Sequence, residues 1–259
     1  MLHGFLKVFQ TIVKNRRTFH KFTYKDSNFR LCCRDVLRMT DEIIRQRTIL
    51  EEYIVRQPEF KTSLVPLRPL QDAPEIARRM CRAAMDVGVG PMAAVAGAIA
   101  QCAAEAAVNE GDEDVIVENG GDIFMVVSNP LSIGIHAGPQ SPFNGLAFRV
   151  EPDDTPLAIC SSSSMMGHSM SMGACDLATV VAKDASLADA AATLAANLVA
   201  TPEDLEPTAA RILAVPGVLG VLLIKSDKMA IQGTLPELVR NADSDTLLKI
   251  TRDVNSQQL

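Results

Sequence analysis

The sequence predicts an α+β fold in which a largely antiparallel sheet is packed by helices. Strand-like apolar segments between residues 114 and 150 are short and are separated by the turn signals Gly120-Gly121 and Asn129-Pro130. Short strands with tight connections pair antiparallel. The helical patterns follow groups of strands instead of alternating with them one for one, which is typical of α+β folds. We therefore expect one α+β domain over residues 19–235.

The first half of the chain predicts a hairpin followed by three helices. Loosely alternating apolar residues flank a turn-forming Asp-Ser-Asn at 26–28, which indicates the hairpin. The first helix has apolar residues at helical spacing and Thr40 or Asp41 as its N-cap. The third helix is rich in alanine, so it should pack closely, and its amino end would also favour an anion. The predicted elements are strands over 19–24 and 29–33 and helices over 39–56, 74–88 and 92–108.

The second half of the chain predicts strands with two further helices. Ser186 is the expected N-cap of the first of these helices, and Ser226-Asp227 is the turn of a final hairpin. Residues 236–259 are polar and weakly patterned, so short helical turns and a polar tail are expected there. The predicted strands cover 114–118, 123–128, 131–136, 146–150, 157–160, 177–182, 218–225 and 229–232, and the predicted helices cover 187–199 and 207–213.

The charge of the chain argues against general affinity for nucleic acid. The formal net charge is −6, whereas nucleic-acid binding needs concentrated positive charge. The charge is uneven, because residues 1–60 carry +5 and the remainder carries −11. Residues 1–18 are expected to form an amphipathic extension. A basic end of this kind can contact an acidic partner or a membrane surface, but a solvated basic helix face is the more common explanation.

The cysteines and the hydropathy pattern favour a cytoplasmic protein. The six cysteines are scattered, and no Cys-x-x-Cys occurs, which favours reduced thiols over a metal site or a disulfide framework. No apolar run is long enough to cross a bilayer, so no membrane span is expected. The apolar start at 1–13 is interrupted by Lys7 and Gln10 and lacks the small-residue cleavage site of a signal peptide.

The segment that follows the strand predicted at 157–160 combines hydroxyls, glycines and an imidazole. It contains Ser161, Ser162 and Ser163, with His168 further along. Serine hydroxyls and glycine backbone N–H groups can bind anionic oxygens, and a histidine can transfer a proton near neutral pH. A polar loop that lines a pocket and a flexible serine-rich connector fit this composition about equally.

A Gly-Gly turn joins two of the predicted strands. Gly120 and Gly121 permit positive φ and close backbone approach, while Asn119 and Asp122 place polar side chains beside them. Such a group can bind a substrate. Asn-Gly is also a standard hairpin turn, and this stretch taken alone favours the hairpin.

A carboxylate and a hydroxyl share one face of the helix predicted at 187–199. Asp189 and Thr193 are four residues apart, and most of their neighbours are alanines. Two exposed hard oxygen donors amid small side chains are suited to Mg²⁺. Alternatively, Asp189 is an aspartate of the first helical turn that the helix dipole stabilises.

The order of these motifs resembles a bacterial and archaeal family that is distantly related to the ApbE-type FAD:protein FMN transferases. The resemblance extends through roughly residues 20–235. The motifs that carry it are Val89-Gly90-Pro91-Met92, Glu118-Asn119-Gly120-Gly121-Asp122-Ile123, Gly167-His168-Ser169 and Leu187-Ala188-Asp189-Ala190-Ala191-Ala192-Thr193.

This resemblance implies a two-layer, T-fold-like architecture and a site that binds FAD with Mg²⁺ against its diphosphate. It also implies that Asp189 and Thr193 are metal ligands, that a backbone carbonyl within 119–121 completes the coordination, and that His168 corresponds to the family's histidine. The sequence departs from the transferases at two positions. Ser164 stands where their Thr-Ser-Ser-Gly has glycine, and their His-x-x-Asp-Pro does not follow His168.

Three functions are consistent with these residues. The first is an enzyme that transfers or hydrolyses the phosphoryl or flavinyl group of a flavin or nucleotide diphosphate with Mg²⁺. In that case serines 161–163 and residues 119–122 would bind the substrate, and His168 would activate a hydroxyl or water. The second is a module that binds FAD, FMN or another small anion without turnover. The third is a homo-oligomeric structural protein in which the glycines and serines only shape turns.

Overall fold

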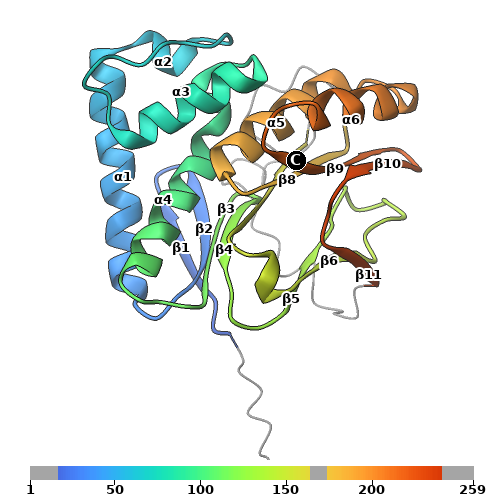
Figure 1. The fold of residues 1–259 in the computed structure, drawn as a ribbon, viewed down its shortest axis with the longest axis horizontal. Coiled ribbons are helices and arrows are strands. Elements are labelled where there is room, and N and C mark those ends of the chain that lie inside the picture. The colour runs from blue at the N-terminus through green and yellow to red at the C-terminus, as the bar shows by residue number, and fades with distance from the viewer. Residues whose placement is uncertain (1–16, 164–173, 241–259) are drawn as a thin grey trace, which may run out of the picture.

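The structure is a computed structural model in which an eight-stranded sheet forms the centre of the molecule (Figure 1). It describes residues 17–163 and 174–240, so most of the predicted extension and tail lie outside the described residues. All neighbouring strands of this sheet pair antiparallel, which confirms the predicted α+β class. In spatial order the strands are β1 (His20–Tyr24), β2 (Ser27–Cys32), β3 (Val115–Asn119), β4 (Asp122–Val126), β7 (Leu157–Ser162), β8 (Leu177–Ala182), β9 (Val218–Lys225) and β10 (Lys228–Gly233).

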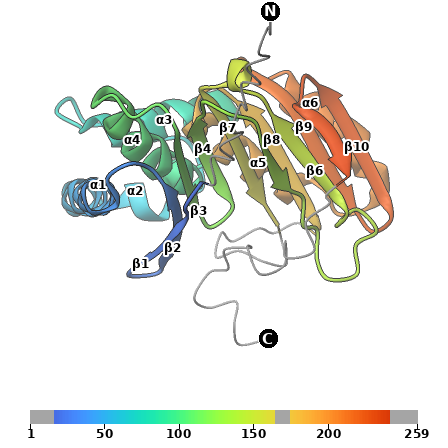
Figure 2. The ribbon, with the colours of Figure 1, turned by 90° about the horizontal axis from the view of Figure 1, so that it is seen from below.

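A second, three-stranded sheet packs on one face of the large sheet (Figure 2). Its strands are, in order, β11 (Glu237–Arg240), β6 (Leu146–Val150) and β5 (Leu131–Gly134). The short helical turns predicted after residue 236 are wrong here, because Glu237–Arg240 pair antiparallel with β6. Leu238 packs into the apolar cluster between the two sheets, so burial of this side chain favours the extended conformation over the local polar pattern.

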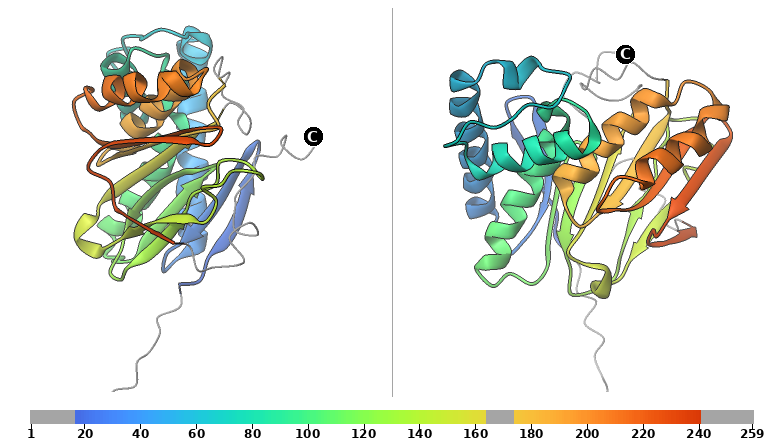
Figure 3. Two further views of the ribbon diagram at one scale, coloured as in Figure 1. Left: turned by 90° about the vertical axis from the view of Figure 1, so that its right-hand side faces the viewer. Right: turned by 45° about the horizontal axis from the view of Figure 1, so that its top comes forward.

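Helices cover the other face of the large sheet, and α5 and α6 lie side by side over strands β7 to β10 (Figure 3). The first helix begins at Val36 instead of residue 39, because the Asp35 carboxylate and not Thr40 or Asp41 caps it by accepting the Arg38 N–H. The α-helices are α1 (Val36–Arg56), α2 (Glu59–Thr62), α3 (Glu75–Val87), α4 (Val95–Asn109), α5 (Ala185–Leu198) and α6 (Leu205–Leu213), and the 3₁₀ turns are Pro91–Ala94, Pro152–Asp154 and Pro202–Asp204.

One helical stretch, Pro91–Asn109, is long and apolar enough by length and composition to cross a membrane, with a mean hydropathy of 1.4. The expectation that no such run exists is therefore wrong by that measure. This stretch includes α4, which packs against α1, α5, β3 and β4 in the structure. Over half of it is buried inside the protein, as in the core helix of a globular domain.

Alternate side chains of the central strands enter two different apolar clusters. In β3, Val115 and Val117 face the helices, whereas Ile116 faces the small sheet. In β7, Cys160 faces the helices and Ile159 faces the small sheet. A strand presents successive side chains to opposite faces, so each polar residue at the end of these strands is directed either toward the helices or toward the small sheet.

Candidate functional site

Two segments that the sequence singled out meet at the amino end of helix α4. The Asn119 Nδ2 atom, at the end of β3, donates a hydrogen bond to the Ala96 carbonyl over 3.2 Å. The Gly97 N–H donates to Asp189 Oδ2, on α5, over 2.9 Å. Ala96 and Gly97 are consecutive, so Asn119 and Asp189 converge although 70 residues separate them in the sequence. Sequence reasoning missed Ala96 and Gly97, for which the only signal was the low bulk of the alanine-rich helix.

Gly97 permits the close approach of α4 and α5 that creates this junction. A Cβ atom added at Gly97 would lie 2.2 Å from the Ala185 carbonyl oxygen and 3.0 Å from Asp189 Cβ. The first contact is with backbone, which cannot rotate away as a flexible side chain can. The two helices must therefore separate if this position carries any side chain.

Gly97→Ala is expected to destabilise the protein by about 1–3 kcal/mol, the usual cost of overpacking, despite the roughly 1 kcal/mol that alanine gains over glycine in a helix. Urea denaturation measures the change in the free energy of unfolding. Gly145→Ala is the matched control, because nothing lies within 4 Å of a Cβ added there. A Gly97 variant as stable as the control variant would contradict this account of the helix junction.

The Gly-Gly turn is a two-residue hairpin, as predicted. Gly120 and Gly121 have φ values of 63° and 107°, a backbone conformation that residues with a Cβ rarely adopt. Asn119 and Asp122 are direct cross-strand partners across this turn. Both lie on the side of the sheet that faces the helices and are buried, so the hairpin presents an amide and a carboxyl group to α4 and α5.

The hairpin carboxyl group forms a buried acidic pair with Asp189. Asp122 is 7% exposed and Asp189 is 8% exposed. Burial, followed by the negative charge of Asp189, raises the pKa of Asp122 well above its usual range. Burial also raises the pKa of Asp189 to about 7, opposed by the backbone N–H groups of Gly97 and Ala96. The charges that raise the pKa of Asp122 are those of Asp189 and Glu118, both negative, and no cation is among the main influences on this carboxyl group.

The raised pKa of Asp189 predicts that metal-free protein loses stability as pH rises from about 4 to about 7. The folded-state pKa is about 7 against a reference of 3.8, so the folded protein retains a proton that the unfolded chain releases. The contribution is fully present below the unfolded pKa and is lost as pH rises through the folded pKa, at roughly 1.4 kcal/mol per unit of pKa difference. Urea denaturation in EDTA measures the free energy of unfolding of the wild type and of Asp189→Asn. Over this pH range the free energy of the wild type should fall relative to that of the variant. A difference between the two proteins that does not change with pH would contradict the raised pKa.

The three serines do not share one face of the sheet. The Ser161 Oγ atom lies 2.9 Å from Thr179 Oγ1 on the side of the small sheet, so its hydroxyl is directed away from Asp122. Ser162 is on the helix side, 9% exposed, and its Oγ has no hydrogen-bond partner among the described residues. Ser163 is also buried. The structure thus brings Ser162, but not the Ser161 hydroxyl, toward the acidic pair.

Helix α5 differs from its predicted form in ways that affect the metal hypothesis. It begins at Ala185 with Asp184 as N-cap, instead of Leu187 with Ser186 as cap. Asp189 therefore lies beyond the first turn and is buried instead of exposed, so a dipole interaction in the first turn does not explain it. Thr193 follows one turn later and is half-buried. His168 lies outside the described residues.

The donors at this junction suit a small hard cation, although they form no complete protein cage. No group of three or more His, Cys, Asp or Glu side chains in residues 17–163 and 174–240 could hold a metal ion. Mg²⁺ usually binds through one or two carboxylates together with waters and substrate phosphates. The unpaired Oδ1 of buried Asp122 and the neighbouring Asp189 carboxylate match that requirement.

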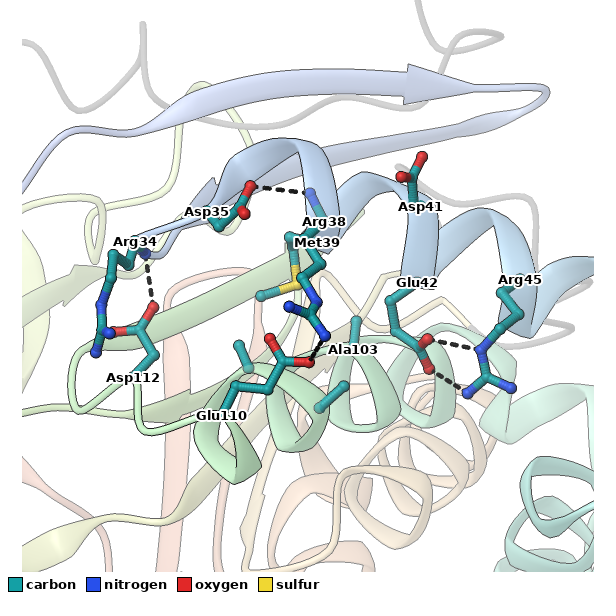
Figure 4. Close-up of a pocket in the computed structure, with 12 residues that line it drawn as sticks. Arg34, Asp35, Arg38, Met39, Asp41, Glu42, Arg45, Ala103, Glu110 and Asp112 are labelled. Carbon is teal, nitrogen blue, oxygen red and sulfur yellow. Dashed lines mark hydrogen bonds and ion pairs between the residues drawn. The ribbon is translucent and has the colours of Figure 1, made fainter.

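A separate cavity of about 430 Å³ lies between the start of α1 and the end of α4 (Figure 4). Its charged rim is largely paired within the protein, since Arg38 contacts Glu110 and Arg45 contacts Glu42. This cavity is at the carboxyl end of α4, whereas the acidic pair is at the amino end of this 15-residue helix. A helix of that length spans about 22 Å, so the two places are distinct.

These features define an antiparallel α+β domain with a buried acidic junction between its sheet and its helices. The family model described as AbpE bacteria matches residues 28–234, so the chain belongs to that family. The UPF0280 protein from Methanocella arvoryzae is 44% identical to this chain over 200 residues, which are 77% of this chain and 81% of that protein. The UPF0280 protein from Methanothrix thermoacetophila is also 44% identical to this chain, over 199 residues, which are 76% of this chain and 83% of that protein. The UPF0280 protein of Archaeoglobus fulgidus is 41% identical over 210 residues, 80% of this chain and 86% of that protein.

Solved structures of ApbE proteins share the fold. The apo flavinyl transferase ApbE from Pseudomonas stutzeri matches with a TM-score of 0.54 and 11% identity, covering 84% of this chain and 95% of that chain. A histidine variant of the flavin transferase ApbE from Vibrio cholerae matches with a TM-score of 0.50 and 14% identity, covering 91% of this chain and 100% of that chain. The resemblance to an ApbE-like family is thereby confirmed.

Proposed function

We propose that this protein binds FAD or a related flavin or nucleotide diphosphate together with Mg²⁺ at the junction of β3, β4, β7, α4 and α5. The observation that carries the proposal is the buried pair of Asp122 and Asp189 with no described cation beside it. Burying a charge without a partner is costly. A divalent cation neutralises such a pair and leaves coordination positions for phosphate oxygens. The flavin transferases named among the structural neighbours support a flavin as the ligand.

The residues around the junction have separate roles in this proposal. The amide groups of α4 orient the Asp189 carboxylate, and Thr193 adds a hydroxyl one turn along the same helix. Backbone carbonyls of residues 119–121 and the unpaired Ser162 hydroxyl provide further polar contacts for the cation or the ligand. When bound, Mg²⁺ would neutralise the diphosphate and polarise its phosphoryl oxygens.

Catalysis is the finer part of the proposal and depends on His168. In the enzyme, this imidazole accepts a proton from an incoming hydroxyl or water as the phosphoryl or flavinyl group is transferred. The alternative is a module that binds the same ligand without turnover. The serine at position 164 and the missing Asp-Pro after His168 favour this alternative, because both departures fall in the segment that would perform the chemistry.

Quantitative binding tests the proposed function. EDTA-treated protein should bind FAD when MgCl₂ is added and lose most of that affinity in EDTA, as measured by the change in flavin fluorescence. Mass spectrometry of small molecules released from protein purified without added ligand identifies the natural ligand class. FAD binding that is equal in Mg²⁺ and EDTA would contradict the metal part of the proposal, and no binding of FAD, FMN or ADP would contradict the whole.

The compartment and assembly complete the proposed function. All six cysteines are free thiols, and four of them are buried, which supports a reducing compartment such as the cytoplasm. A homo-oligomer stays a prediction, and sedimentation of the purified protein measures it directly.

A further inference from the structure

One carboxylate oxygen of Asp122 has no hydrogen-bond partner among the described residues. The carboxyl group receives hydrogen bonds from Cys160 and from the backbone of Ser161, yet its Oδ1 atom is buried and has no partner among the described residues. An unpaired buried acceptor usually costs about 1–3 kcal/mol. The hairpin does not need this aspartate, because the two glycines alone provide the turn conformation. The hydrogen bonds that Asp122 accepts thus leave one of its carboxylate oxygens available to a ligand.

A second unpaired atom lies on the same side of the neighbouring strand. Strand β7 pairs with β4, with Ile159 opposite Ile123, so Ser162 and Asp122 are both at the ends of paired strands. Both face the helices, and both are more than nine-tenths buried, with exposed fractions of 7% for Asp122 and 9% for Ser162. The Ser162 Oγ is unpaired as well. Two unpaired oxygens therefore lie on the helix side, at the ends of neighbouring strands. The Asp122 carboxyl group is also close enough to Asp189 for the two to interact, and oxygen atoms of this kind are the ligands that Mg²⁺ takes.

We propose that Asp122 is a second carboxylate ligand of the divalent cation, so that the cation is held between strand β4 and helix α5. This inference rests on the proposed function and deepens it. The sequence motif places Asp122 with the substrate-binding residues, and in the structure its carboxyl group is buried and interacts with Asp189. Its consequence concerns the order of binding. Two carboxylates neutralise a divalent cation without phosphate oxygens, so the cation binds to the free protein and the nucleotide follows.

The experiment compares Mn²⁺ binding, by titration calorimetry and electron paramagnetic resonance, in EDTA-stripped wild type, Asp122→Asn and Asp114→Asn. Asp114 is a matched control because it lies just before β3, away from the turn, and pairs with Arg17. Wild type and the control should bind Mn²⁺ without nucleotide. Asp122→Asn should bind it at least about tenfold more weakly and should regain binding when FAD supplies phosphate oxygens.

Stability measurements separate ligation from a folding role. Metal-free Asp122→Asn at pH 8 should be at least as stable to urea as the wild type, because it removes a buried carboxyl group beside Asp189 and the asparagine oxygen can still accept the hydrogen bond from the Ser161 backbone. If this variant does not fold, Asp122→Ser gives the same comparison with a smaller side chain. A loss of stability with unchanged Mn²⁺ affinity would show that Asp122 is structural and would overturn the inference.

The outcomes also distinguish this inference from the proposed function. If wild type and Asp122→Asn bind Mn²⁺ equally, and only in the presence of FAD, the inference fails while Mg²⁺-dependent flavin binding stands. If the wild type binds neither Mn²⁺ nor FAD, the proposed function fails and the inference fails with it.

Discussion

Asp189→Asn is expected to lower Mg²⁺-dependent FAD affinity by about 100-fold or more, which corresponds to roughly 2.8 kcal/mol of binding free energy. The amide oxygen of asparagine can still accept the Gly97 N–H that Asp189 now binds, so the helix junction is preserved while the negative charge is lost. The measurement is FAD titration in MgCl₂ and in EDTA. In EDTA the variant and the wild type should differ little, because the charge acts through the cation.

The matched control for that prediction is Asp86→Asn, which removes an exposed carboxylate from helix α3. It should bind FAD as the wild type does. Alanine is a poorer choice at position 189. It would leave the buried Gly97 N–H without its acceptor at a cost of about 1–3 kcal/mol, so a folding defect would accompany any binding defect. If Asp189→Asn retains full Mg²⁺-dependent affinity, then Asp189 is structural and the metal site lies elsewhere.

His168→Ala is expected to retain FAD and Mg²⁺ binding while turnover falls by roughly 10²–10⁴-fold, the usual contribution of a positioned general base. The measurement is kcat together with the dissociation constant of FAD, for wild type and variant at saturating Mg²⁺. If His168 only binds phosphate, the variant should show the opposite effects: its affinity for FAD falls, and its kcat at saturating ligand changes little. The two outcomes therefore assign His168 to chemistry or to binding.

The wild-type protein is the control for that experiment. Its turnover must be assayed with FAD, with other nucleotides and with protein acceptors. No turnover with any of them, alongside intact Mg²⁺-dependent FAD binding, would contradict the enzyme proposal and leave the binding module. Ser164 stands where the transferases have glycine and favours binding without turnover. The comparison of turnover with FAD binding in the wild type therefore decides directly between the enzyme and the binding module.

Local sequence patterns predicted the secondary structure well because they act over short distances. The strands Leu146–Val150 and Leu177–Ala182 have the predicted bounds, and Gly120-Gly121 form the predicted turn. The predicted helix starts were less accurate. Asp35 and Asp184 are the observed N-caps, whereas the sequence pattern predicted Thr40 or Asp41 and Ser186. Several residues in each of these stretches can cap a helix, and the pattern alone does not choose among them.

The sequence by itself determined the α+β class, the antiparallel pairing and the set of polar residues at the ends of strands. Only the tertiary structure decided which of those residues meet. Strand alternation and registry send Ser161 to the small sheet and Ser162 to the helices. The close contact at Gly97 brings α5 to α4 and buries Asp189. Asp122 and Asp189 are 67 residues apart, and their proximity depends on packing between layers, which local spacing does not encode.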